Sequence, residues 1–145
     1  MSRFILILML FFGSWLYGDT VFAEPKPSID NPRKIVFSIT QESDEALDHI
    51  LSVANNVLKF YGPENVQMEI VAYSKGIRLL ERKNKAVAVR VDALMQYDVV
   101  FIACGNTMRT KEIKPEDLIE GSEIVTAGVV ELLERVKEGW IYIKP

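Results

Sequence analysis

Residues 98–110 read DVVFIACGNTMRT, and this stretch decides the fold. Its segment 99–103 is a short apolar run that leads directly into the only cysteine, Cys104, and then into Gly105. A strand that is apolar on both faces is typical of the middle of a parallel sheet, because helices cover such a sheet from both sides. In open α/β sheets, ligands bind beyond the carboxyl ends of the strands. The sequence therefore predicts that Cys104 lies where chemistry is expected.

Strand-like and helix-like segments alternate on both sides of this stretch. Strands are predicted over 34–40, 66–72, 99–103, 123–126 and 140–144. Helices are predicted over 45–61, 77–82, 86–95 and 128–137, with a short one beginning at Pro115. The segment 86–95 also alternates like a strand, but two parallel strands need a crossover of a dozen or more residues, which favours a helix. This order predicts an α/β fold, a three-layer α/β/α sandwich around a mainly parallel five-stranded sheet.

Two of the predicted helices have a recognisable capping residue or a regularly spaced set of apolar residues. Ser43 or Asp44 is placed to cap the helix over 45–61. The last helix is predicted to turn one apolar face toward the core, and that face consists of Val129, Leu132, Leu133 and Val136.

The first 33 residues are predicted to lie outside the folded domain. Residues 1–23 have the layout of a secretory signal peptide, with Arg3, an uncharged apolar run over 4–17 and small residues before a cut after Ala23. This run of 14 residues is shorter than the roughly 20 that a membrane-spanning helix needs. Residues 24–33, EPKPSIDNPR, are predicted to form a flexible leader, which leaves 34–145 as a single domain. We therefore expect an exported, periplasmic protein without stable membrane insertion after cleavage.

Composition and missing motifs narrow the function classes. The chain has a net charge of −3 and no basic stripe, so nucleic-acid binding is not expected. The sequence contains neither GxGxxG nor GxxxxGK[ST], so no nucleotide cofactor is expected, and it contains no CxxC pair. An exported protein with a single cysteine has no internal disulfide framework, which leaves Cys104 as a free thiol within the chain.

The residues after Cys104 predict an activated thiol. A helix N-terminus stabilises a thiolate through its unpaired backbone amides and its aligned peptide dipoles. If Asn106 caps the helix, its amide and those of Thr107 and Met108 are expected near the sulfur, with Arg109 adding positive charge. Lys111 adds a second positive charge nearby, and Gly105 is expected to permit unusual backbone angles at the turn. The predicted catalytic residue is therefore Cys104, with Asn106, Thr107 and Arg109 as binding residues.

Other interpretations of the same residues remain open. Cys104 can be a buried apolar residue at the end of a strand. A soft-metal site with Met108 would have only two ligands, so no metal is predicted. His49 lies off the apolar stripe of its helix, so a cysteine–histidine pair has little support. The chain can also be a structural subunit, with Trp140 and Tyr142 as candidate interface residues.

A non-catalytic binding module is the main alternative. In that interpretation the loops after the strands form a pocket for a small anion, and the cysteine is incidental. The pocket residues would be Tyr73, Ser74, Gly76, Asn106 and Gly128.

Several segments resemble the DsrE/DsrF-like family, and the resemblance covers essentially the whole chain after the leader. They are KIVFSIT (34–40), YSKGI (73–77), VVFIACGNTMRT (99–110) with PEDL (115–118), and IVTAGVVELLERVKEGWIYIKP (124–145). The resemblance is to an exported branch of this family. It implies a DsrEFH-like sandwich with flavodoxin-like topology and assembly into a homotrimer or homohexamer.

The resemblance also implies a chemistry for Cys104. In the best understood members a single cysteine carries sulfur as a persulfide, between sulfur donor and acceptor proteins or small sulfur species. The chain departs from the relay members at Gly105, Asn106, Thr107 and Thr110, where those members tend to have small apolar residues and paired arginines. The function expected is an exported sulfur carrier or sulfurtransferase that holds persulfide sulfur on Cys104, without a redox or hydrolytic motif.

Overall fold

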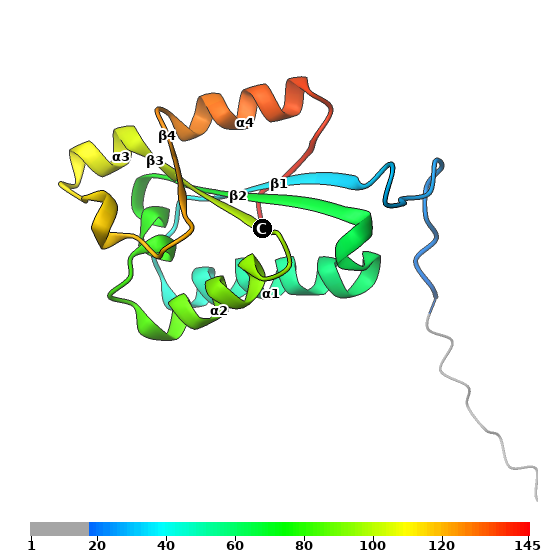
Figure 1. Cartoon of the computed structure of the whole chain (residues 1–145), viewed down its shortest axis with the longest axis horizontal. Helices are drawn as coiled ribbons and strands as arrows, with labels where there is room; N and C mark the ends of the chain where they lie inside the picture. The colour runs from blue at the N-terminus through cyan, green and yellow to red at the C-terminus, as the bar shows by residue number, and fades with distance from the viewer. Residues whose placement is uncertain (1–17) are drawn as a thin grey trace, which may run out of the picture.

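A parallel sheet of five strands, in the order β4-β3-β2-β1-β5, forms the middle of the molecule (Figure 1). The computed structural model describes residues 18–145, so most of the predicted signal peptide lies outside the described residues. The strands are β1 (Arg33–Ile39), β2 (Val66–Ala72), β3 (Val100–Cys104), β4 (Glu123–Val125) and β5 (Ile141–Ile143). The helices are α1 (Asp44–Tyr61), α2 (Lys85–Met95), α3 (Gly105–Thr110) and α4 (Gly128–Lys137). The predicted three-layer α/β/α fold is confirmed.

The connections decide which helices share a face of the sheet. From β1 to β4 each strand lies beside the one before it, and the right-handed crossovers place α1 and α2 on the same face. The connection from β4 to β5 runs back across the whole sheet, so α4 lies on the opposite face, as Figure 1 shows. The last strand, β5, therefore lies at the edge of the sheet beside β1. In the flavodoxin strand order, 2-1-3-4-5, this edge position belongs to the second strand, so the two strand orders differ there.

The larger core lies between the sheet and the pair α1 and α2. Phe37, Ile70 and Phe101 point from the three central strands into this layer and are fully buried. Leu47 of α1 packs in the same cluster. Helix α1 begins where the sequence predicts, because the hydroxyl of Ser43 accepts a hydrogen bond from the amide of Ala46 at 3.2 Å.

The prediction about which residues of α4 face the core is wrong for most of them. Of the four residues predicted to face the core, only Leu132 is buried, whereas Val129, Leu133 and Val136 expose 51%, 63% and 47% of their surfaces. Together with Val130 they form what we call the outer face of α4. The sheet face beneath α4 holds a smaller apolar cluster, so one inward leucine is enough to cover it.

Smaller differences concern the connections. The helix predicted over 77–82 is a 3₁₀ segment, η2, over Ser74–Leu80, and the one beginning at Pro115 is the 3₁₀ segment η3, Pro115–Asp117.

Before β1, the ring of Phe22 packs against that of Phe60 in α1, with 5.2 Å between the ring centroids. Within residues 18–145, no helix has the length and apolar character needed to cross a membrane.

Candidate functional site

Cys104 is the last residue of β3 and also the N-cap of α3. It pairs in register with Val125 of β4. Successive side chains of a strand alternate between faces, so Cys104 shares the α4 face with Ile102. The thiol is buried, with 6% of the residue surface exposed. It therefore lies at the predicted carboxyl edge of the sheet, but beneath the molecular surface.

Two helix starts converge on this thiol. Gly128 is the first residue of α4, and a Cβ added to it would lie 3.3 Å from the Cβ of Cys104 and 3.0 Å from Cγ1 of Val71. Gly105, the first residue of α3, is equally confined, because its added Cβ would lie 2.9 Å from the carbonyl oxygen of Val125. Glycine at both positions lets the two helices begin beside the cysteine, with their first amides free of intrahelical partners.

These amides make the thiol more acidic. Burial alone would raise the pKa of Cys104, but hydrogen bonds from the Gly128 amide, from the hydroxyl and amide of Thr107 and from the Asn106 amide outweigh it. The net pKa of the thiol lies below its ordinary value of 9.0. The Asn106 amide also donates to the carbonyl of Thr126 at 3.1 Å, so we assign more of the effect to Gly128 and Thr107. Thiolate stabilised in this way is the nucleophilic form of cysteine.

A cavity of about 310 Å³ lies beside the thiol. It is lined by Tyr73, Ser74, Asn106, Thr107, Thr110 and Lys111. Its wall includes two residues that hydrogen-bond the sulfur, whereas Cys104 itself does not line it. The Ser74 amide donates to the hydroxyl oxygen of Thr107 at 2.9 Å, which joins the loop after β2 to α3. The cavity therefore offers the Ser74 hydroxyl, the Asn106 side-chain amide and the Lys111 ammonium group to a small anion, since the hydroxyls of Thr107 and Thr110 donate to the sulfur and to the carbonyl of Asn106.

The fold and this cysteine site agree with a family comparison. Residues 34–145 match the DsrE/DsrF-like family. This chain belongs to the DsrE/DsrF-like family. The match covers the whole sheet except Arg33, the first residue of β1, and includes Cys104 and both helix starts that meet it.

Three solved structures resemble this DsrE/DsrF-like chain. A protein of unknown function from Methanobacterium thermoautotrophicum, MTH1491, is 33% identical with a TM-score of 0.74, over 78% of this chain and 99% of that one. The ychN protein from E. coli is 20% identical with a TM-score of 0.67, over 78% and 99%. A conserved protein of unknown function from Bacteroides thetaiotaomicron, BT1422, is 14% identical with a TM-score of 0.59, over 77% and 94%. The last two show the fold alone, and no curated protein matches the sequence.

The structure brings together most of the predicted site residues of this DsrE/DsrF-like domain. Asn106, Thr107 and Gly128 adjoin the sulfur, and Tyr73 and Ser74 line the neighbouring cavity. Two predicted residues have other roles. Arg109 donates to the side-chain oxygen of Asn106 and does not line the cavity. Gly76 is a packing residue, because an added Cβ would lie 2.1 Å from the carbonyl oxygen of Ile39.

Three predicted details of the cysteine loop are wrong. Asn106 does not cap α3, because the helix begins one residue earlier and Cys104 occupies the cap position. Gly105 is not among the residues with a positive φ, so its role is the close approach to β4 rather than an unusual backbone angle. Met108 packs in the larger core under α1 and α2, on the opposite side of the sheet from the Cys104 side chain. The third amide at the sulfur comes from Gly128 instead of Met108.

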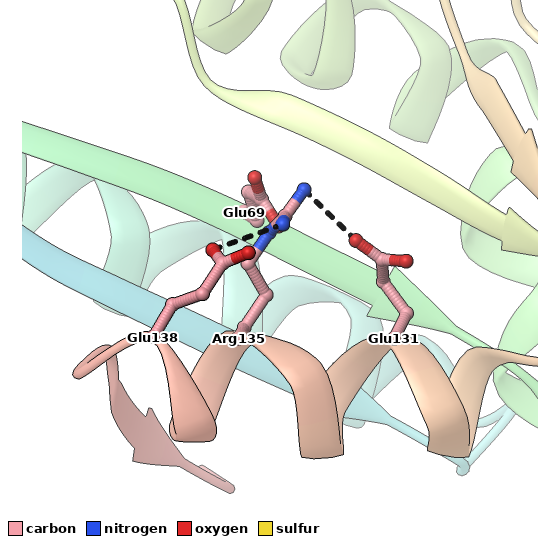
Figure 2. Close-up of polar contacts among 4 residues, drawn as sticks. All are labelled: Glu69, Glu131, Arg135 and Glu138. Carbon is pink, nitrogen blue, oxygen red and sulfur yellow. Dashed lines mark hydrogen bonds and ion pairs between the residues drawn. The ribbon is translucent and has the colours of Figure 1, made fainter.

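A buried ion pair lies farther along α4 (Figure 2). Arg135 donates through Nε to the carboxylate of Glu69, 2.7 Å away in the middle of β2. Glu131 and Glu138 of the same helix contact the other guanidinium nitrogens at 2.9 and 3.2 Å. The guanidinium also lies 5.5 Å from the ring centroid of Trp140. Burial raises the pKa of Glu69, although the hydrogen bond and charge of Arg135 oppose the shift.

Proposed function

We propose that this chain is an exported sulfur carrier that holds persulfide sulfur on Cys104. The observation that supports the proposal most is the set of donors around one buried thiol. Amides from the starts of α3 and α4, together with the Thr107 hydroxyl, lower its pKa in spite of burial. A low-pKa thiolate is what attack on a sulfur–sulfur bond requires. Membership of the DsrE/DsrF-like family supports the same chemistry.

The proposed step is a transfer without net oxidation. The Cys104 thiolate attacks the outer sulfur of a persulfide donor, and a new sulfur–sulfur bond forms at Cys104. The donor's own sulfur–sulfur bond breaks, and its thiolate leaves with the electron pair and takes a proton from water. Transfer to an acceptor thiolate reverses these bond changes. The surrounding amides stabilise the negative charge on sulfur at both stages.

Mass spectrometry of the intact protein tests the carrier proposal. After exposure to inorganic polysulfide, the wild type should gain mass in multiples of one sulfur atom, and reducing agent should remove it. Cys104→Ser should gain none while it keeps the wild-type thermal unfolding temperature. A wild-type thiol that alkylates quantitatively but never gains sulfur would overturn the proposal.

Export is a separate part of the proposal. It is supported by the charge and apolar pattern of residues 1–23. Expression of the full chain in a Gram-negative host should yield periplasmic protein whose mass corresponds to a chain beginning at residue 24. A cytoplasmic product that retains Met1 would contradict it.

We also propose that the protein forms a homotrimer or homohexamer, and that its partners are sulfur donors and acceptors. The outer face of α4 supports self-association, because four large apolar side chains on one helix are exposed. Family membership supports it as well. Light scattering coupled to size exclusion should give three or six times the chain mass, and a monomer at micromolar concentration would contradict the assembly.

A small-anion binding module is the second candidate, and the cavity beside Cys104 favours it. The cavity offers the Lys111 ammonium group to an anion, whereas the Thr107 hydroxyl donates to the sulfur and the Thr110 hydroxyl donates to the carbonyl of Asn106 at 3.1 Å. In that case Cys104→Ser should keep the thermal stabilisation that thiosulfate or sulfite gives to the wild type. Loss of the stabilisation in Lys111→Met, but not in Lys137→Met, would place the anion in this cavity.

A further inference from the structure

Helix α4 turns three residues toward the sheet, and they recur at helical spacing. Gly128 and Leu132 are its buried residues, and Arg135 reaches Glu69 in β2. Steps of four and three residues place all three on one side of the helix. The other large apolar residues of α4 form its exposed outer face. Since a single leucine supplies the apolar packing of this helix, the ion pair contributes a contact that apolar packing does not duplicate.

Strand β2 provides contacts for both ends of α4. Glu69, Val71 and Tyr73 alternate along β2 and the residue after it, so they share the face that α4 covers. A Cβ added to Gly128 would lie 3.0 Å from Cγ1 of Val71 and 3.4 Å from the Cβ of Tyr73, whereas Arg135 donates to Glu69 at 2.7 Å. The seven residues of helix between these contacts rise about 10 Å, and the four residues of strand span about 13 Å. Helix α4 therefore runs back along β2, from the carboxyl edge of the sheet to the ion pair.

The start of α4 is confined against the cysteine but has no capping side chain. A Cβ added to Gly128 would lie 3.3 Å from the Cβ of Cys104, and the Gly128 amide donates to the sulfur. The N-cap residue of the helix, Ala127, makes no side-chain hydrogen bond to this end. Glycine has no side chain with which to hold the start in place. The position of this end therefore depends on contacts farther along α4.

The ion pair is directional, as Figure 2 shows. Arg135 contacts Glu131 and Glu138 of its own helix at 2.9 and 3.2 Å, and it lies 5.5 Å from the ring centroid of Trp140. These neighbours fix the conformation of the arginine side chain. The bond to Glu69, which is 7% exposed, joins the helix to the sheet. A charge-assisted hydrogen bond from a planar guanidinium fixes geometry more closely than an apolar contact does.

We propose that Glu69 and Arg135 are positioning residues for the thiol site. Their ion pair sets where α4 lies on the sheet, and the rigid helix carries this position to Gly128, two turns away. Loss of the pair lets the start of α4 move away from Cys104. The inference rests on the proposed carrier function, since it concerns how the same thiol is held ready for attack.

The first test is the pH dependence of Cys104 alkylation by iodoacetamide in Glu69→Met. This change removes the bond to the sheet, while Arg135 keeps Glu131 and Glu138 as partners. The midpoint should rise by about half a pH unit, which is part of the roughly one unit that loss of a hydrogen bond to a charged group would cause. A direct effect of charge has the opposite sign, because removal of a nearby negative charge lowers the pKa of a thiol. The direction of the shift therefore identifies positioning.

Variants of the partner and two controls complete the test. Arg135→Met should raise the midpoint by a similar amount, and Arg135→Lys by less, because lysine keeps the charge but not the guanidinium geometry. Lys137→Met removes an exposed cation from the same helix and should leave the midpoint unchanged. Leu58→Ala opens a cavity in the larger core on the other face of the sheet, so it should lower stability without moving the midpoint. Thermal unfolding of each variant checks the fold, and Glu69→Met decides the question alone if Arg135→Met does not fold.

The outcomes separate this inference from the carrier proposal. An unchanged or lowered midpoint in folded Glu69→Met would overturn the inference even if the wild type takes up sulfur. A midpoint that rises equally in Leu58→Ala would also overturn it, because the thiol would then respond to stability rather than to the position of α4. A raised midpoint in Glu69→Met, together with a wild type that never takes up sulfur, would support positioning and overturn only the carrier proposal.

Discussion

The backbone amide of Gly128 donates a hydrogen bond to the sulfur of Cys104, although the whole of β4 lies between them in the sequence. Gly128 begins α4, the helix that also carries Arg135 of the buried ion pair and the exposed outer face. One helix therefore contacts the Cys104 thiol and carries both a buried charge and a candidate association surface.

Gly128→Ala should weaken both the fold and the thiol site. The added Cβ would lie 3.0 Å from Cγ1 of Val71 and 3.3 Å from the Cβ of Cys104, so we expect a shift of a few tenths of an ångström at the start of α4 or in these side chains. Overpacking of this kind costs about 1–3 kcal/mol in the free energy of unfolding. The shift moves the amide away from the sulfur, and the alkylation midpoint of Cys104 should rise. Urea denaturation and the pH dependence of alkylation measure the two effects, and an unchanged midpoint would show that this amide does not stabilise the thiolate.

Thr107→Val should raise the pKa of Cys104, whereas Thr107→Ser should leave it near the wild-type value. Valine keeps the shape of threonine but removes the hydroxyl that donates to the sulfur and accepts from the Ser74 amide. We expect the alkylation midpoint to rise by about one pH unit. Equal midpoints for the valine and serine variants would contradict a role for the hydroxyl.

Arg135→Met should destabilise the protein in a pH-dependent way. It leaves the buried Glu69 carboxylate without its partner, which costs about 2–4 kcal/mol. This value lies somewhat below that of fully buried pairs, because Arg135 is partly exposed. Without Arg135, the pKa of Glu69 rises further above its ordinary value, because the two interactions that lower it are lost. The folded state then binds a proton more tightly than the unfolded chain, so the free energy of unfolding falls as pH rises through the folded-state pKa.

The loss in Arg135→Met should therefore be larger at pH 8 than at pH 5. Adding Glu69→Gln should recover part of it at pH 8, since the amide carries no charge. Lys137→Met, which removes an exposed cation from the same helix, is the matched control. Denaturation curves at the two pH values provide the measurement, and a loss independent of pH would contradict the explanation from an unpaired carboxylate.

Leu133→Glu should break self-association without unfolding the chain. Leu133 is 63% exposed in the single chain, so its substitution leaves the core intact. A carboxylate buried at a contact between copies is left without a partner, and the dissociation constant should rise by about tenfold or more. Sedimentation equilibrium measures this, with the neighbouring exposed change Glu134→Gln as the control. Unchanged assembly would show that the outer face of α4 is not the contact.

The sequence predicts most of the fold because the apolar pattern and the turn residues agree. Helix α4 and strand β2 have the predicted bounds. Strand β1 is shifted by one residue at both ends and α1 begins one residue earlier, at element ends, where assignments are least definite. The sequence predicts the wrong orientation for α4, because apolar residues occur on more than one side of this helix. Periodicity identifies a helix, but the surface available on the sheet decides which side faces inward.

The candidate site likewise contains residues that a local sequence pattern predicts and residues that only the tertiary arrangement brings in. Cys104 and the neighbouring Asn106 and Thr107 follow from a strand that ends at a helix start, which is a local pattern. The hydrogen bond from Gly128 depends on α4 crossing back over the sheet to Cys104, which no local pattern contains. The sequence predicts Lys111 as a positive charge near Cys104 but not its place in the cavity wall, which its spacing of one helical turn from Thr107 indicates.

Because α4 lies near the end of the chain, the surroundings of the Cys104 thiol change while the chain is being synthesised. Cys104 and α3 leave the ribosome before Gly128 and β5 do, so the nascent cysteine has only part of its final set of donors. Full acidity is reached once the crossing from β4 to β5 has closed over the sheet. A chain that has not completed this closure would carry a thiol with a more ordinary pKa. An acidic, reactive Cys104 would therefore report that folding is complete.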